Sequence, residues 1–420
     1  MSTLSAESVN EIKQLAADAT KDPITNIPGV SIAVINKNGD LLVEHAAGKI
    51  GVNSDEPMTT DNTFWIASCT KVSATIVALQ AVEKGIVSLD SADDVEKWCP
   101  ELANIPIIKD ITNDGTVTLV PKSTRITLRM LLSHTSGFSY TFFNKNYNEY
   151  AKLFGLDELN GGPGCVNKFP LAFEPGTNWG YGVGIDWAVD VVSRASGKSF
   201  QHLLSEGIFQ PLGFTLVSTT PCDAIKSRLV KLHQRDLDTG KLSEIPQSMK
   251  WPLSDKPDLA AQAYQSGGAG IFAKPSEYVR IFSALLNGGV YAPTGARLLR
   301  EETVKLMFEN QIPQWPDFAR QGIQTTQPLV SHTLPEIFPQ EGNPPQGWGL
   351  SFFLTPTETP YGRGKNTAFW CGIANLYYWI DVEKGVAGFV AAQLYPFADP
   401  QVLKLWIDVE VATYKGLTVA

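Results

Sequence analysis

The 420-residue chain lacks the features of a nucleic-acid-binding or membrane protein. Its formal net charge is −9, its isoelectric point is near 5.2, and no block of basic residues offsets the acidic excess. Nucleic acids and anionic membranes attract positive surfaces, so neither is an expected partner. No run approaches the roughly 18 apolar residues of a membrane span. Residues 1–17 form a polar, amphipathic pattern without the apolar stretch of a secretory signal.

Cysteine is scarce, and the usual metal and nucleotide signatures are missing. The five cysteines are scattered and form no Cys-x-x-Cys pair, which argues against a disulfide scaffold or a structural zinc site and suits a reducing compartment. We therefore expect a cytoplasmic protein. The five histidines show no metal-ligand spacing, and there is no Walker A motif and no Gly-x-Ser-x-Gly elbow. We expect no metal and no cofactor.

Strand patterns at both ends of the chain predict an α+β fold. Residues 30–35 are apolar and β-branched, and Asn38-Gly39 predicts a hairpin into residues 41–43. Further strands are expected at 350–354, 376–380 and 386–392, followed by a helix that begins after Asp399 and ends before Gly416. These strands predict one antiparallel sheet flanked by helices.

The middle of the chain has helical spacing instead. Helices are expected at residues 72–84, 128–132, 185–195, 200–209 and 276–286, with a small hairpin at Asn113-Asp114-Gly115. We therefore predict a sheet domain of residues 1–71 and 265–420 and an inserted, mainly helical domain of residues 72–264. The active site is expected at their junction. The proline-rich residues 311–346 are expected to form an ordered loop or lid.

Ser68-Cys69-Thr70-Lys71 is the first candidate for catalysis. A serine and a lysine three positions apart share one face of a helix. Residues 64–67 form an extended run, so Ser68 is expected at a helix N-terminus, where free amides favour negative charge. Burial would lower the pKa of Lys71 from about 10.4 to about 7.5 at a cost of about 4 kcal/mol, so that it acts as a neutral base. A lysine on a surface helix is the alternative.

Two further segments supply groups that acyl transfer needs. A Pro-Gly turn leads to Tyr181, just before a helix, and a phenol near a neutral lysine can pass a proton. In Trp370-Cys371-Gly372-Ile373 the glycine allows close backbone approach, so the amides of Ser68 and Ile373 can form an oxyanion hole. Taken alone, Tyr181 also fits an aromatic at a domain seam, and the second segment fits a core strand.

Aromatic residues near these segments are candidates for substrate binding. Tyr140 and Phe142 belong to an aromatic cluster that is either core or the lining of an acyl pocket. Trp348, Trp370 and Gly372 complete the predicted substrate-binding set. His134 is interpreted as structural, because Lys71 already fills the role of the base.

In this order the segments resemble the serine β-lactamase and penicillin-binding-protein superfamily, in its class C-like branch. The similarity rests on residues 28–34, 64–71, 126–137, 209–213 and 266–270. The Tyr181-Gly182-Val183-Gly184-Ile185-Asp186-Trp187-Ala188 segment and Ala374-Asn375-Leu376 resemble family VIII esterases and fungal transesterases of the lovastatin acyltransferase type. The resemblance implies Ser68 as nucleophile, Lys71 as base and Tyr181 as proton shuttle. Which of Lys71 and Tyr181 holds the proton stays open.

Two departures from the family pattern bear on the substrate. Val183 stands where β-lactamases of this branch have the asparagine of Tyr-x-Asn, and Trp370 stands where they have a lysine that holds a carboxylate. Both favour neutral, aromatic or acyl substrates. The resemblance thus implies a serine esterase or acyltransferase that forms an acyl-enzyme on a small-molecule ester or thioester, with secondary metabolism as an expected setting.

The expected partners are a small-molecule acyl donor and an alcohol or water acceptor, with a carrier-protein thioester as a further candidate donor. Two alternatives stay open at this point. One is an amidase, D-aminopeptidase or β-lactamase, and the other is a non-catalytic acyl-binding protein of the same fold.

Overall fold

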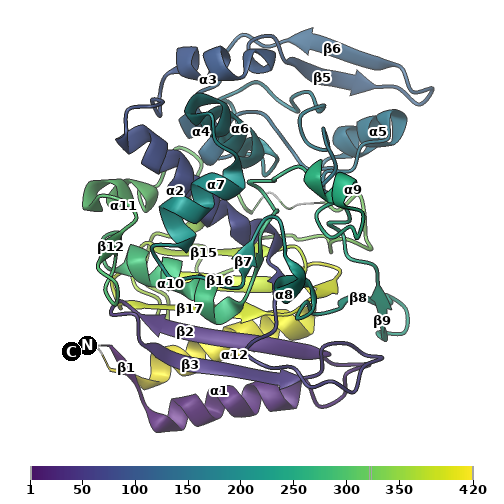
Figure 1. The fold of residues 1–420 in the computed structure, drawn as a ribbon. Coiled ribbons are helices and arrows are strands. Elements are labelled where there is room, and N and C mark those ends of the chain that lie inside the picture. The colour runs from purple at the N-terminus through teal and green to yellow at the C-terminus, as the bar shows by residue number, and fades with distance from the viewer. Residues whose placement is uncertain (1, 321, 323, 419–420) are drawn as a thin grey trace.

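The centre of the molecule is a seven-stranded antiparallel sheet in the order β13-β14-β15-β16-β17-β2-β3. The computed structural model describes residues 2–320, 322 and 324–418 (Figure 1). The strands of this sheet are β2 (Gly29–Asn36), β3 (Leu41–Gly48), β13 (Gly347–Trp348), β14 (Phe353–Thr355), β15 (Thr367–Gly372), β16 (Leu376–Asp381) and β17 (Val386–Ala391). The N-terminal strand β2 pairs with β17 from the C-terminal part, so the predicted single sheet is confirmed.

Helices cover both faces of this sheet. On one face lie α1 (Ala6–Ala19) and α12 (Pro400–Gly416), and on the other lies α10 (Pro275–Leu286) (Figure 1). The Asp399 carboxylate accepts hydrogen bonds from the amides of Gln401 and Val402, which begins α12 where the sequence predicted. Gly416 is the last residue of this helix and does not follow its end, as the sequence had suggested.

The remaining helices lie mostly on the far side of α10 from α12 (Figure 1). They are α2 (Thr70–Glu83), α3 (Ala92–Trp98), α4 (Leu128–Leu132), α5 (Lys145–Phe154), α6 (Gly184–Ser196), α7 (Phe200–Leu204), α8 (Asp223–Lys226), α9 (Pro257–Ala261) and α11 (Glu301–Met307), with short turns η1 (Ala67–Cys69), η2 (Pro100–Leu102) and η3 (Ser205–Phe209). The helix expected at 200–209 therefore continues from α7 into the wider turn η3. Helix α2 is buried nearly all round, as expected for a helix inside a core.

Short strands complete the fold. The predicted hairpin at residues 113–115 joins β5 (Pro106–Ile111) to β6 (Val117–Pro121). The other short strands are β1 (Thr3–Leu4), β4 (Phe64–Trp65), β7 (Val217–Ser218), β8 (Leu232–Arg235), β9 (Leu242–Ile245), β10 (Phe272–Ala273), β11 (Val290–Tyr291), β12 (Ala296–Arg297), β18 (Leu394–Tyr395) and β19 (Leu417–Thr418). Strand β7 pairs with β10, and β8 pairs with β18, so two sheets join the spans predicted as separate domains. The domain division itself stays a prediction.

The proline-rich segment matches the predicted ordered loop. Its described residues, 311–320, 322 and 324–346, contain no helix or strand, and Gln321 and Ile323 lie outside the described residues. Among the helices that are described, none combines the length and the apolar character needed to cross a membrane.

Candidate active site

Ser68 stands on a tight turn between strand β4 and helix α2. The extended run predicted for residues 64–67 ends at Trp65, because the chain turns at Ala67, whose φ of 44° is in the left-handed region. Such a conformation is strained for an alanine and persists only where the surroundings fix it. Here the Ile66 amide donates to the Ile271 carbonyl at 3.0 Å, and the Cys69 amide donates to the Ile66 carbonyl at 3.0 Å. The turn presents Ser68 just before the N-terminus of α2, as predicted.

Lys71 is fully buried one helical turn from the serine. Its Nζ donates hydrogen bonds to Ser68 Oγ at 3.1 Å, to the Tyr140 hydroxyl at 3.0 Å and to the Gly268 carbonyl at 2.9 Å. In the part of the chain that the structure describes, no carboxylate forms an ion pair with it. Burial therefore lowers the pKa of Lys71 to about 8, although the charge of Asp186 acts in the opposite direction. A lysine in this environment can lose its proton near neutral pH.

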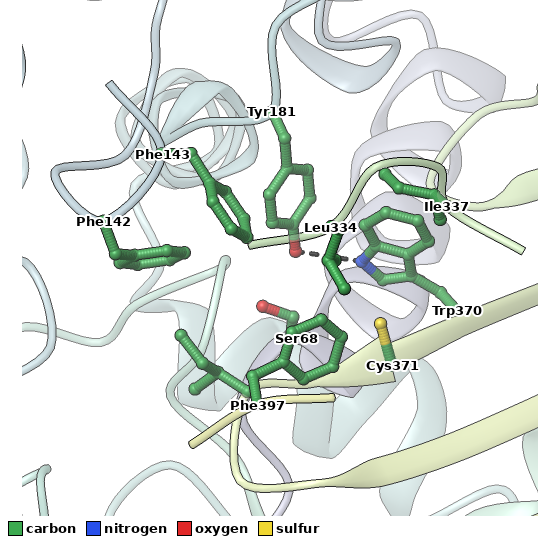
Figure 2. Close-up of a pocket in the computed structure, with 10 residues that line it drawn as sticks. Ser68, Phe142, Phe143, Tyr181, Leu334, Ile337, Trp370, Cys371 and Phe397 are labelled. Atoms are coloured by element: carbon green, nitrogen blue, oxygen red, sulfur yellow. Dashed lines mark hydrogen bonds between the residues drawn. The ribbon is translucent and has the colours of Figure 1, made fainter. Parts of the chain in front are cut away.

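Two phenols lie beside the amine, in different positions. The Tyr181 hydroxyl accepts a hydrogen bond from Trp370 Nε1 at 2.9 Å and points toward the same space as Ser68 (Figure 2). The Tyr140 hydroxyl instead contacts Lys71 directly, whereas the Lys71 Nζ lies 4.8 Å from the centre of the Tyr181 ring. Burial raises the pKa of both phenols well above its usual value. Both phenols therefore remain protonated when Lys71 becomes neutral.

A buried aspartate holds the third hydrogen-bond acceptor of Lys71 in place. Asp186 accepts hydrogen bonds from Ser266 Oγ at 2.5 Å and from the Gly268 amide at 3.0 Å, which fixes the glycine-rich turn whose Gly268 carbonyl faces Lys71. A Cβ at position 268 would lie 2.4 Å from Asp186 Oδ2, so a larger residue there would displace this carboxylate. No local signal in the sequence indicated the contact of this turn with the lysine.

The end of strand β15 approaches the serine turn closely. A Cβ at Gly372 would lie 2.6 Å from the Ile66 carbonyl oxygen, which agrees with the close backbone approach inferred from this glycine. The next residue, Ile373, lines the same pocket as Ser68. The two residues predicted to form an oxyanion hole are therefore brought together.

The pocket over Ser68 is narrow and apolar. Its empty space is about 450 Å³, including the part open to solvent, and its walls are Ser68, Phe142, Phe143, Tyr181, Leu334, Ile337, Trp370, Cys371, Ile373 and Phe397 (Figure 2). Leu334 and Ile337 belong to the proline-rich segment, which thus covers the pocket in the way the predicted lid would. Phe142 and Trp370 are pocket residues, as the sequence suggested.

The other three predicted substrate residues lie elsewhere. Tyr140 contacts Lys71, Gly372 meets the serine turn, and Trp348 is fully buried with its ring 4.6 Å from that of Trp370. The sequence missed Phe397, which follows the short strand β18 and carries no local signal. Its loop is fixed by Asn375, whose Nδ2 donates to the Pro396 carbonyl at 2.8 Å.

His134 has the structural position that the sequence indicated. Its ring packs 4.7 Å from the Tyr181 ring, and its Nδ1 accepts a long hydrogen bond from the Gly182 amide at 3.4 Å. Burial lowers the pKa of His134 well below its usual value, so the ring is neutral. No group of three or more metal-ligating side chains occurs within the described residues.

Comparison with known proteins places the chain in a family. The Beta-lactamase family model matches residues 12–412. A lovastatin esterase of Penicillium rubens is 30% identical over 378 residues, which cover 87% of this chain and 89% of that protein. A monacolin J acid methylbutanoyltransferase of Aspergillus terreus is 30% identical over 407 residues, 92% of each chain. The solved structure of the LovD6 mutant of simvastatin synthase from Aspergillus terreus superposes with a TM-score of 0.81 at 28% identity and covers 98% of this chain and 95% of that one.

These comparisons confirm the predicted fold, and they confirm an enzyme over a non-catalytic binding protein. The chain belongs to the Beta-lactamase family, within which it is a serine esterase or acyltransferase.

Proposed function

We propose that Ser68 is the nucleophile of this enzyme and that Lys71 is its base. The observation that carries the proposal is the 3.1 Å contact between Lys71 Nζ and Ser68 Oγ, made by an amine that burial brings to a pKa of about 8. A neutral amine at hydrogen-bond distance can take the hydroxyl proton as the oxygen attacks an acyl carbon. The amides of Ser68 and Ile373 would stabilise the oxyanion that forms.

Tyr181 is proposed as the group that passes the proton to the departing oxygen or sulfur. Its hydroxyl points into the pocket over Ser68 and stays protonated at neutral pH (Figure 2). The hydrogen bond from Trp370 Nε1 fixes the orientation of this hydroxyl. Collapse of the tetrahedral intermediate then leaves the acyl group on Ser68, and an alcohol or water releases it by the reverse sequence of proton transfers.

The proposed acyl donor is a small ester or thioester with a short, apolar acyl group. Apolar side chains form most of the pocket wall. None of its described wall residues is a cation that could hold a carboxylate, since Trp370 stands at the position where a lysine would do so. The relative named a methylbutanoyltransferase moves a short, branched acyl group, which supports this size. A carrier-protein thioester as donor, a role in secondary metabolism and a cytoplasmic location are parts of the same proposal. The five free thiols support the last of these.

Replacement of the serine tests the assignment. Ser68→Ala is expected to abolish turnover of p-nitrophenyl butyrate and labelling by a fluorophosphonate, measured by intact-protein mass spectrometry. Ser73→Ala is a matched control, because Ser73 lies on the same helix but binds Tyr278 away from the pocket. This control is expected to keep both activities. Labelling of the Ser68→Ala protein at another residue would refute the proposal.

A further inference from the structure

A second and larger cleft borders the Ser68 pocket at Phe142, which lines both spaces. Its empty space is about 1400 Å³, including the part open to solvent, against about 450 Å³ for the Ser68 pocket. Several parts of the chain form its walls. They are Thr141, Asn148 in helix α5, the turn after α5, residues 245–250, residues 326–330 of the proline-rich segment, and Tyr395. It is larger than the space over Ser68 and is lined by polar as well as apolar side chains.

The cleft contains a buried carboxylate of which one oxygen accepts two hydrogen bonds. Glu158 lines the cleft and is 5% exposed. Its Oε1 accepts hydrogen bonds from the Thr141 amide at 2.8 Å and from the Thr141 hydroxyl at 2.7 Å. The hydrogen bonds that Thr141 donates both go to Oε1, and none of the side-chain hydrogen bonds of the described residues ends on Oε2. A carboxylate oxygen at such a place is an acceptor that lacks a donor.

A second acceptor without a donor belongs to Gln247, another residue of the cleft wall. The Gln247 side chain donates through Nε2 to the Val230 carbonyl at 2.8 Å, a contact that fixes which end of the amide is the oxygen. Its Oε1 is buried and has no hydrogen-bond partner among the described residues. Buried polar atoms in native structures are usually paired, so the unpaired Gln247 oxygen, in the same cleft wall as the Glu158 Oε2, calls for a ligand that brings donors.

We propose that this cleft binds the hydroxyl- or amide-bearing part of a substrate whose acyl carbon lies at Ser68. The inference rests on the proposed function. The Ser68 pocket can take an apolar acyl group, but among its described wall residues only Ser68 and Tyr181 carry a hydroxyl, and the reaction itself uses both. The polar part of the substrate is therefore recognised in the neighbouring cleft, where Glu158 Oε2 and Gln247 Oε1 accept its O–H or N–H groups. Either the alcohol acceptor or the amide-bearing arm of a thioester donor has this chemistry.

The two spaces are joined by a short, hydrogen-bonded stretch. Thr141 donates a hydrogen bond to Glu158. Its neighbours in the chain are Tyr140, which contacts Lys71, and Phe142, which lines the Ser68 pocket. The proline-rich segment is fixed to the same stretch, because Thr326 donates to the Phe142 carbonyl at 3.0 Å and Gln327 Nε2 donates to Thr141 Oγ1 at 3.0 Å. A ligand in the cleft thus lies against the residues that shape the catalytic pocket.

The test compares matched substrates with and without donor groups. One arm compares kcat/KM for the butyryl thioester of pantetheine with kcat/KM for the butyryl thioester of ethanethiol. The other uses p-nitrophenyl butyrate as donor and compares acyl transfer to 1,2,6-hexanetriol with transfer to 1-hexanol. The proteins are the wild type, Glu158→Gln, Gln247→Leu and Glu302→Gln. The last makes the same chemical change at an exposed residue of α11 that lines neither space, and it is the control.

In the wild type we expect a preference for the donor-bearing substrate in one arm, and that arm identifies the source of the ligand. Glu158→Gln keeps the acceptor for Thr141 but loses the charged Oε2, so the preference should fall about tenfold. Gln247→Leu should reduce it severalfold and carries the test if the first variant does not fold, as judged by thermal unfolding. The Glu302→Gln protein should keep the preference.

The absence of a preference in both arms would overturn this inference, as would a preference that survives both cleft substitutions. Failure of the proposed function gives a different result. In that case the wild-type protein would not be labelled at Ser68 by the fluorophosphonate, whatever its behaviour toward the two substrate pairs.

Discussion

Two fully buried cations in this protein have opposite environments. Arg363, under helix α12, donates from Nε and Nη2 to the Glu410 carboxylate at 2.5 and 2.9 Å, and its guanidinium lies 4.0 and 4.4 Å from the centres of the Phe338 and Phe369 rings. Lys71, beside Ser68, contacts neutral oxygens only. The exposed fraction of both side chains is zero, so burial alone does not distinguish them.

The charge of the partner decides which cation stays charged. Burial alone would lower the pKa of Arg363, but the charge and hydrogen bonds of Glu410 outweigh that effect and the pKa is raised. The same burial lowers the pKa of Lys71 to about 8, because no carboxylate is in contact with it. One cation therefore ties a helix to the sheet, while the other is kept ready to lose its proton.

Lys71→Met should have the largest effect and separates activity from stability. Loss of a general base typically costs about 10²–10⁴ in rate, so we expect kcat/KM for p-nitrophenyl butyrate to fall at least about 10²-fold. The urea midpoint should not decrease, because a lysine held at a pKa of about 8 itself costs the fold about 3 kcal/mol at pH 7. A variant that is both inactive and strongly destabilised would show that the amine is structural.

Glu410→Gln should have the reverse effect of Lys71→Met, because it should lower stability and leave activity unchanged. Removal of one partner leaves Arg363 buried and without a counter-charge, which typically costs about 3–5 kcal/mol of unfolding free energy. Urea denaturation should show this loss, while kcat/KM at 25 °C stays within about twofold of the wild type. Asp408→Asn is the matched control, since it removes a surface ion pair with Lys404 on the same helix and should cost less than about 1 kcal/mol. Equal losses in the two variants would remove the contrast between the buried and the surface pair.

The sequence predicted local features better than contacts between distant segments. The Asn-Gly hairpin, the Asp399 cap and the glycine at position 372 each have a short-range physical cause, and the structure has them where they were expected. The extended run predicted for residues 64–67 was too long, since the strand ends at Trp65. Ala67 adopts a left-handed conformation that only its buried surroundings impose.

The candidate site shows the same division. Ser68 and Lys71 are close in the chain, and their contact follows from helical spacing. Tyr140, Phe397 and Gly268 reach the site through folds of the chain that no local pattern records, so Tyr140 was assigned to substrate and Phe397 was missed. Trp348 was expected in the pocket because of its aromatic ring, yet it packs fully buried behind Trp370.

The smallest expected effect concerns the pH dependence, and it tests whether Asp186 belongs to the electrostatics of Lys71. If neutral Lys71 is the base, kcat/KM for p-nitrophenyl butyrate should rise with pH through a midpoint near 8. The Asp186 charge raises the pKa of Lys71, so its removal in Asp186→Asn should move this midpoint to lower pH, by about one unit or less. The asparagine keeps an oxygen for the Ser266 hydroxyl and the Gly268 amide, so the turn is expected to persist. Burial also raises the pKa of Asp186, and an aspartate that is already protonated would leave the midpoint unchanged. The Glu410→Gln protein should give the wild-type profile, because its lost charge lies next to Arg363 and not next to Lys71.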